Sequence, residues 1–183
     1  MKDILIRKAT KNDDEIIATV VVMAIGEDLA KTYCGENYHQ VFKELVSLEV
    51  SQYSYNNAFV AEIDGKPIGA AVAYDGADLY RLREATLNLI SLRSGYKPEI
   101  NEDETDASEF YLDSLGVLPE YRGSGVGAKL IQAVCDKAAD CNKPAGLLVD
   151  FENPNAERLY NSLGFKRVNE KDFLGHKMWH LSR

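Results

Sequence analysis

Residues 112–130 read LDSLGVLPEYRGSGVGAKL, and this stretch decides the fold because it predicts a strand, a short loop and a glycine-rich turn that opens a helix. Pro119 ends the strand, since proline has no N–H for a sheet ladder. Glycine then occupies every second position, at Gly123, Gly125 and Gly127, so the backbone can approach a ligand without an intervening Cβ. From Val126 the apolar residues recur at helical spacing, which aims unpaired N–H groups and a positive helix end at the space over the glycines.

The start of this helix is therefore an expected anion site, most naturally for a phosphate or pyrophosphate. A Walker loop is excluded because Ala-Lys-Leu at positions 128–130 stands where Gly-Lys-Ser/Thr is required. A dinucleotide fingerprint fits residues 123–128 with Asp150 as a ribose contact, but it needs its glycines directly after the strand, and residues 118–122 intervene. A third pattern, Arg/Gln-x-x-Gly-x-Gly/Ala, is matched by RGSGVG at residues 122–127.

With the preceding LGVLPEY, this third pattern resembles the acetyl-CoA pyrophosphate loop of the GNAT superfamily of N-acetyltransferases. Residues 153–165, NPNAERLYNSLGF, resemble the second signature of these enzymes. The resemblance covers most of the chain and accounts least for residues 78–107. It implies one GNAT domain over residues 1–183 with an α/β (α+β) fold: a mixed, twisted central sheet of about six to seven strands, flanked by helices and splayed at the acetyl-CoA site.

The remaining patterns predict the elements of such a fold. Strands are expected at residues 4–6, 58–63, 68–74, 145–151, 165–168 and 176–181, with Asp64-Gly65 as the hairpin turn between the second and third. Helices are expected from Thr10, over residues 37–50, 78–94 and 126–140, and from the N-cap Asn153 to Gly164. Residues 99–109 carry six acidic side chains and no basic one, which is typical of a solvated loop and would also attract a cationic acceptor.

Composition narrows the class of protein. A chain of 183 residues suits one domain with a sizeable core. A net charge of −8 without clustered lysine and arginine argues against nucleic acid and favours cationic partners. The three cysteines lack metal-type spacing, and the chain shows neither a signal peptide nor an apolar run long enough for a bilayer. We therefore expect a cytoplasmic enzyme without a metal or a membrane partner, and the oligomeric state stays open, a homodimer included.

The resemblance implies which residues bind acetyl-CoA. They come from the central strand, the glycine loop, the start of the helix and the second signature: Leu115, Gly116, Val117, Arg122, Gly123, Ser124, Gly125, Val126, Gly127, Ala128, Asn153 and Tyr160. A backbone N–H of the strand would stabilise the oxyanion that forms at the acetyl carbonyl. Tyr160 is also the candidate general acid for the departing thiolate, because a phenol with a pKa near ~10 is protonated at neutral pH.

The catalytic base has three candidates. Glu109, Tyr111 and Asp113 project to one side of the central strand, because side chains alternate. In several members of the family a glutamate at the position of Glu109 is the proposed base. Asp113 is the rival carboxylate, and a water-relayed route needs no single base. The three histidines match no base position of the family and are expected to be structural.

These residues together predict transfer of an acetyl group from acetyl-CoA to a primary amine of a small molecule or peptide, by direct attack in a ternary complex. A catalytically silent acyl-CoA-binding sensor is the alternative from another class. A dinucleotide-binding oxidoreductase is the weaker enzyme alternative. Release of coenzyme A with a panel of amines would separate enzyme from sensor, and thermal stabilisation by NAD rather than CoA would favour the oxidoreductase.

Overall fold

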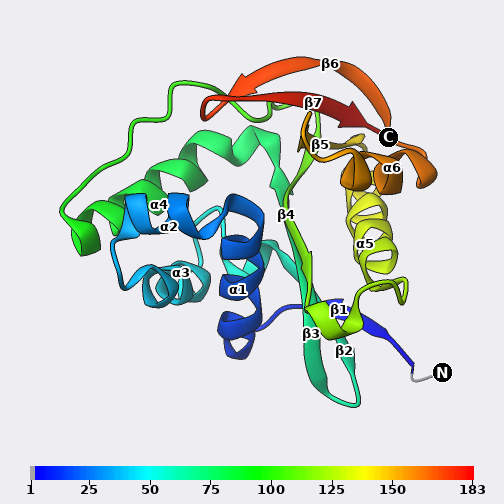
Figure 1. The fold of residues 1–183 in the computed structure, drawn as a ribbon, viewed down its shortest axis with the longest axis horizontal. Coiled ribbons are helices and arrows are strands. Elements are labelled where there is room, and N and C mark those ends of the chain that lie inside the picture. The colour runs from blue at the N-terminus through cyan, green and yellow to red at the C-terminus, as the bar shows by residue number, and fades with distance from the viewer. Residues whose placement is uncertain (1–2) are drawn as a thin grey trace.

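The computed structural model describes residues 3–183. A seven-stranded sheet in the order β1-β2-β3-β4-β5-β7-β6 runs through the molecule. Helices α1 to α4 cover one face, and α5 and α6 cover the other (Figure 1). The strands β4 and β5 pair in parallel, whereas every other neighbouring pair is antiparallel. The mixed α/β fold class expected from the sequence is confirmed.

The elements have these bounds. The strands are β1 (Leu5–Lys8), β2 (Ala58–Ile63), β3 (Lys66–Asp75), β4 (Phe110–Val117), β5 (Ala145–Asp150), β6 (Lys166–Phe173) and β7 (His176–Ser182). The helices are α1 (Asp14–Ile25), α2 (Glu27–Cys34), α3 (Tyr38–Ser47), α4 (Leu79–Ser94), α5 (Val126–Asp140) and α6 (Pro154–Ser162).

Local signals explain several of these boundaries. The side chain of Asn153 accepts a hydrogen bond from the amide of Ala156 at 3.1 Å, and Pro154 occupies the first position of α6, as expected. Gly95 adopts the left-handed conformation that ends α4. The hairpin at Asp64-Gly65 is also confirmed, since it joins β2 to β3 in antiparallel register.

Two expectations for the N-terminal helices were wrong. The helix expected over residues 37–50 ends at Ser47, and Leu48, the next residue, is exposed. The hydroxyl of Ser51 donates to the carbonyl of Leu45 at 2.7 Å and so satisfies one of the helix's terminal carbonyls. Helix α2 was not expected at all; it begins after Gly26, whose positive φ of 89° lets the chain turn sharply out of α1.

The acidic segment 99–109 is only partly the solvated loop that its composition predicts. Glu104, Thr105 and Glu109 are buried, because Arg83 of α4 and His180 of β7 provide polar partners for the two carboxylates. The segment therefore forms part of the protein interior beside the N-terminal end of β4.

Candidate active site

The parallel strands β4 and β5 are hydrogen-bonded to each other over only part of their length. Their pairing covers Phe110 with Ala145, Tyr111 with Gly146, and Leu112 with Leu147. Beyond these residues β4 continues to Val117 and β5 to Asp150 without pairing to each other. The C-terminal halves of β4 and β5 therefore have no ladder hydrogen bonds to each other, and this gap in the ladder, called the opening below, is what the expected splayed sheet requires.

A β-bulge lies at the start of this opening. Val72 and Ala73 are adjacent on β3 but pair with Ser114 and Leu112, so Asp113 is an extra residue on β4. The amide of Leu118 donates to β3, at the carbonyl of Ile68. Because backbone direction alternates along a strand, the amides of Leu115 and Val117 face the opposite edge, towards the opening.

The glycine-rich turn follows at the end of β4. Gly123 and Gly125 have positive φ angles of 75° and 83°, and a Cβ built on either residue would meet no atom within 4 Å. Gly125 is the N-cap of α5 and offers no side-chain cap for the first-turn amides. The turn thus presents open space in front of a positive helix end, which fits the phosphate groups of acetyl-CoA. The guanidinium of Arg122 donates to the carbonyl of Val117 at 3.1 Å and so lies across the end of β4.

Helix α6 borders the opening from the β5 side. A Cβ on Gly127 would lie 3.9 Å from Leu159, so α6 runs beside the first turn of α5. The ring of Tyr160 packs edge-on against Phe165 with centroids 5.9 Å apart. Burial raises the pKa of Tyr160 to about 12. Its hydroxyl has no hydrogen-bond partner among residues 3–183, and the raised pKa keeps it protonated at neutral pH.

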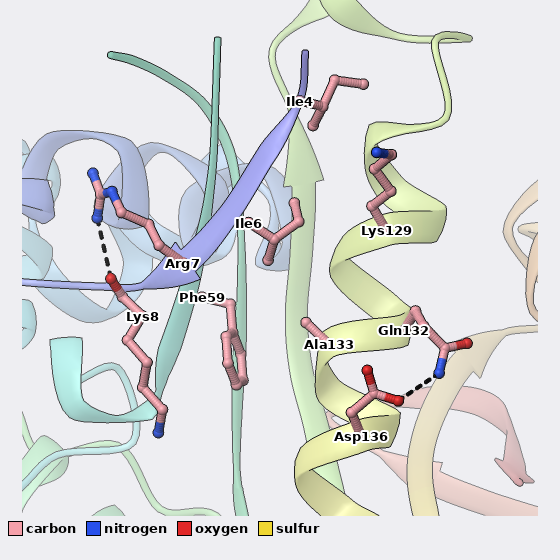
Figure 2. Close-up of a pocket in the computed structure, with 9 residues that line it drawn as sticks. All are labelled: Ile4, Ile6, Arg7, Lys8, Phe59, Lys129, Gln132, Ala133 and Asp136. Atoms are coloured by element: carbon pink, nitrogen blue, oxygen red, sulfur yellow. Dashed lines mark hydrogen bonds between the residues drawn. The ribbon is translucent and has the colours of Figure 1, made fainter. Parts of the chain in front are cut away.

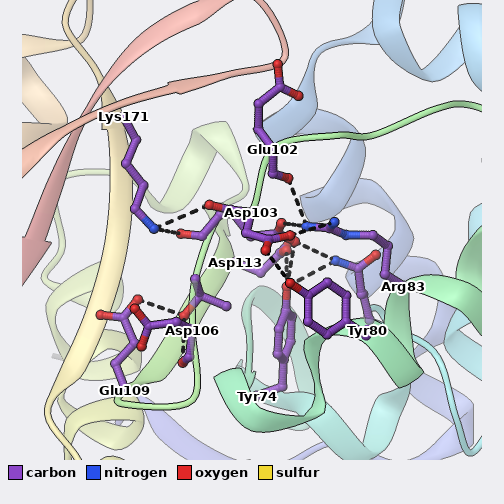
Figure 3. A network of polar contacts seen from close by, with 12 residues as sticks. Tyr74, Tyr80, Arg83, Glu102, Asp103, Asp106, Glu109, Asp113 and Lys171 are labelled. Carbon is purple, nitrogen blue, oxygen red and sulfur yellow. Dashed lines mark hydrogen bonds and ion pairs between the residues drawn. The ribbon is translucent and has the colours of Figure 1, made fainter.

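Asp113 is the carboxylate at the opening. Its Oδ1 accepts a hydrogen bond from Ser114 at 2.8 Å, and its Oδ2 lies 3.1 Å from the hydroxyl of Tyr74 (Figure 3). Burial, reinforced by the negative charge of Glu104, raises the pKa of Asp113 to about 7. The side chain is thus a proton acceptor matched to neutral pH.

Glu109 has a different environment, at the N-terminal end of β4. One carboxylate oxygen accepts from the hydroxyl of Thr105 at 2.7 Å, and the other lies 2.8 Å from Nε2 of His180. Its carboxylate lies directly over Gly146, where a Cβ would come within 1.8 Å of it. Glu109 is 3% exposed, so both of its oxygens are engaged inside the protein and neither faces the strand opening.

The side chains of Glu109, which precedes β4, and of Tyr111 and Asp113 in β4 share one face of the sheet, as expected. Tyr111 pairs with Gly146, and the carboxylate of Glu109 lies over the same glycine. The ring of Tyr111 also lies 5.8 Å from the ring of Tyr74, and the hydroxyl of Tyr74 is hydrogen-bonded to Asp113. Sequence reasoning did not find the partners Tyr74, Glu104 and His180. The sequence did hold a signal for one further residue, Arg83. It lies among the buried residues of α4, and a buried cation needs an acidic partner.

An open groove lies away from these residues. It has a volume of about 530 Å³ and lies between the edge strand β1 and helix α5 (Figure 2). It is lined by Ile4, Ile6, Phe59, Lys129, Gln132 and Ala133, among others, and it includes none of the expected site residues. Within residues 3–183 no cluster of three or more histidine, cysteine, aspartate or glutamate side chains is placed to hold a metal ion. The same residues include no helix of the length and apolarity that crossing a membrane requires.

Several acetyltransferases are similar to this chain in sequence or in fold. The model of the acetyltransferase (GNAT) family matches residues 22–165. An uncharacterized N-acetyltransferase of Archaeoglobus fulgidus is 34% identical over 166 residues, which are 88% of this chain and 92% of that protein. The thialysine N-epsilon-acetyltransferase of Bos taurus is 36% identical over 75 residues, so the match spans only 41% of that relative and 40% of this chain. A solved acetyltransferase structure superposes with a TM-score of 0.82, at 33% identity and 98% coverage of each chain.

Proposed function

Because this chain belongs to the acetyltransferase (GNAT) family and is an acyltransferase, we propose that it moves the acetyl group of acetyl-CoA to a primary amine of a small cationic molecule. The amine attacks directly in a ternary complex. One observation carries this proposal: the pairing of β4 with β5 ends at Leu112 and Leu147. The unpaired part of β4 then runs from Asp113, whose pKa is raised to about 7, towards the glycine turn.

The glycine turn and the strand opening suit the two ends of the cofactor. The first-turn amides of α5, beyond Gly125, receive the pyrophosphate. The amides of Leu115 and Val117 face the opening and are positioned to bind the carbonyl groups of an extended arm. Acetyl-CoA supplies an activated thioester when it is bound. The contribution of the chain is to hold that group against β4, where a backbone N–H stabilises the developing oxyanion.

Asp113 is the proposed base, and it takes this role ahead of Glu109. An amine acceptor arrives as an ammonium ion and must lose a proton before it attacks. Asp113 begins the unpaired part of β4, whereas Glu109 precedes the first paired residue, Phe110, and is held by Thr105 and His180. An ionised Asp113 both attracts the ammonium and accepts its proton, and the charges of the two groups cancel in that step.

Tyr160 is the proposed acid on the other side of the opening. Its hydroxyl is protonated at neutral pH, because burial raises its pKa to about 12. The hydroxyl has no partner among the described residues to compete for its proton. It can therefore donate that proton to the departing thiolate, while the ring stays packed on Phe165.

The acceptor is proposed to be small and positively charged. The chain carries a net charge of −8, which raises the local concentration of cations. The bovine relative is named for acetylating the side-chain amine of thialysine, and this name supports an amino-acid-like or other small amine over a protein substrate. The family model leaves the acceptor open, so the choice among amines belongs to experiment.

The deciding experiment measures release of free coenzyme A from acetyl-CoA with thialysine, lysine, spermidine and a peptide N-terminus as acceptors. We expect release that depends on a small amine, with an acceptor product heavier by one acetyl group and intersecting initial-velocity lines. Asp113→Asn should abolish most of the turnover, whereas the control Asp106→Asn removes an exposed carboxylate that bonds only to Ser108 and should retain it. Tight acetyl-CoA binding without amine-dependent release would indicate a sensor, and parallel velocity lines would exclude direct attack.

A further inference from the structure

A network of polar side chains leads from the candidate base into the protein interior. Tyr74 of β3 lies 3.1 Å from Asp113 Oδ2 and also 3.1 Å from Oε1 of Glu104, which belongs to the acidic segment (Figure 3). The other oxygen of Glu104 is bonded to Arg83 of α4. We propose that Glu104, fixed by Arg83 and linked to Asp113 through Tyr74, is a positioning residue that keeps Asp113 a strong enough base for neutral pH. This inference rests on the proposed function, because it concerns the same base.

A count of protons shows that the two carboxylates are coupled. The single hydroxyl hydrogen of Tyr74 can be donated to only one of its two carboxylate neighbours at a time. Gln52 does not relieve this conflict at Asp113, because its Nε2 donates to Glu104 at 2.8 Å and to Tyr74 at 3.1 Å. When both carboxylates are ionised, one of them therefore faces an oxygen lone pair. A proton on one carboxyl group removes this conflict.

The partners decide which of the two carboxyl groups takes that proton. Glu104 is 3% exposed and is bonded by the cation Arg83 as well as by Gln52. Asp113 has no cationic partner among the described residues; its neighbours are the hydroxyls of Ser114 and Tyr74. A buried anion next to a guanidinium stays ionised, so the negative charge belongs to Glu104 and the shared proton to Asp113.

Groups from several elements face this pair, and the cations among them bind Glu104 and its neighbours rather than Asp113. Tyr74 and Tyr111 are buried and Tyr53 is partly buried; burial raises the pKa values of all three phenols, so they remain neutral. Arg83 is held on the far side of Glu104, where it also bonds Asp103. Lys171 of β6 reaches the backbone carbonyls of Asp103 and Glu104. The negative charge of Glu104 therefore acts on Asp113 across a single phenol oxygen.

The consequence for catalysis is a stronger base. When the ionised Asp113 accepts one proton from the acceptor ammonium, the amine becomes neutral and nucleophilic and Asp113 becomes a neutral acid. That acid can donate to the oxygen of Tyr74, whose own hydrogen then turns to Glu104. The nearby charge of Glu104 favours this protonated state and so raises the proton affinity of Asp113. Without Glu104 the base would be ionised over a wider pH range but would accept a proton less readily.

The test compares pH profiles of kcat/KM in the intact protein. Glu104→Gln alone removes the buried acidic partner of Arg83 and leaves it only the exposed Asp103, which endangers folding. The decisive variant is therefore the double substitution Arg83→Met with Glu104→Gln, which removes both charges. We expect its acidic limb to move to lower pH by about one unit or more, with a lower rate on the plateau because the base is weaker. The matched control Glu102→Gln removes an exposed charge from the same segment and should leave the limb in place.

A second readout does not need turnover. The carboxyl carbons of ¹³C-labelled aspartate are titrated by NMR in the wild type and the double variant, and Asp113 is assigned by its absence in Asp113→Asn. A lower midpoint for Asp113 in the double variant supports the coupling even if no amine is acetylated, in which case the proposed function alone fails. An unchanged midpoint, or a rate loss with an unmoved acidic limb in an active enzyme, would overturn the inference.

Discussion

Replacing Asp113 by asparagine should change how stability depends on pH, and the structure gives the size of the effect. Burial and Glu104 raise the pKa of Asp113 from an ordinary value of 3.8 to about 7. Between these two values the folded protein holds a proton that the unfolded chain releases, so the free energy of unfolding falls as pH rises. Asparagine has no such proton. The difference in stability, variant minus wild type, should therefore increase by about 2.5 kcal/mol between pH 5 and pH 8.

Urea unfolding of both proteins at pH 5 and pH 8 measures this difference. Asp106→Asn is the control, because hydrogen bonds from Ser108 lower the pKa of Asp106 below its ordinary value and leave it ionised in both buffers. Its stability difference should stay constant over this range. A constant difference for Asp113→Asn as well would mean that Asp113 titrates normally, and the base assignment would lose its physical ground.

Three further predictions follow from the same site. Gly125→Val should weaken acetyl-CoA binding at least about tenfold in calorimetry, because the new side chain fills the open space at the helix start. The control Gly175→Val, at a similar φ of 81° in the β6–β7 turn, should carry the same backbone strain of about 1–3 kcal/mol without loss of affinity. Equal affinities in the two variants would refute the loop assignment. Tyr160→Phe should keep the melting temperature and the cofactor affinity but reduce kcat by about 10²–10⁴-fold, and wild-type turnover would leave Tyr160 as a packing residue. Glu109→Gln should lower stability by weakening the contact with His180 while the acidic limb of the kcat/KM profile remains; disappearance of that limb would make Glu109 the base instead of Asp113.

Local chemistry is what the sequence by itself determined. Proline at 119, glycines at 123 and 125 and the pair Asn153-Pro154 each restrict the backbone where they stand. The strand, the glycine-rich turn and helix α6 could therefore be predicted from these residues. The Asp64-Gly65 hairpin could be predicted for the same reason, since its turn needs only its own residues and Asp64 has a positive φ of 52°.

Contacts between distant residues were decided only by the tertiary structure. The charge run at 99–109 reads as solvated because no nearby residue in the sequence neutralises it. It is partly buried because Arg83, 21 residues before Glu104, and His180, 71 residues after Glu109, come to lie against it. The choice between Glu109 and Asp113 likewise depends on where β5 stops pairing with β4, and a pairing register is a property of two strands. A carboxylate's proton affinity follows from its surroundings in space, which is why the sequence could name both candidate bases but could not choose between them.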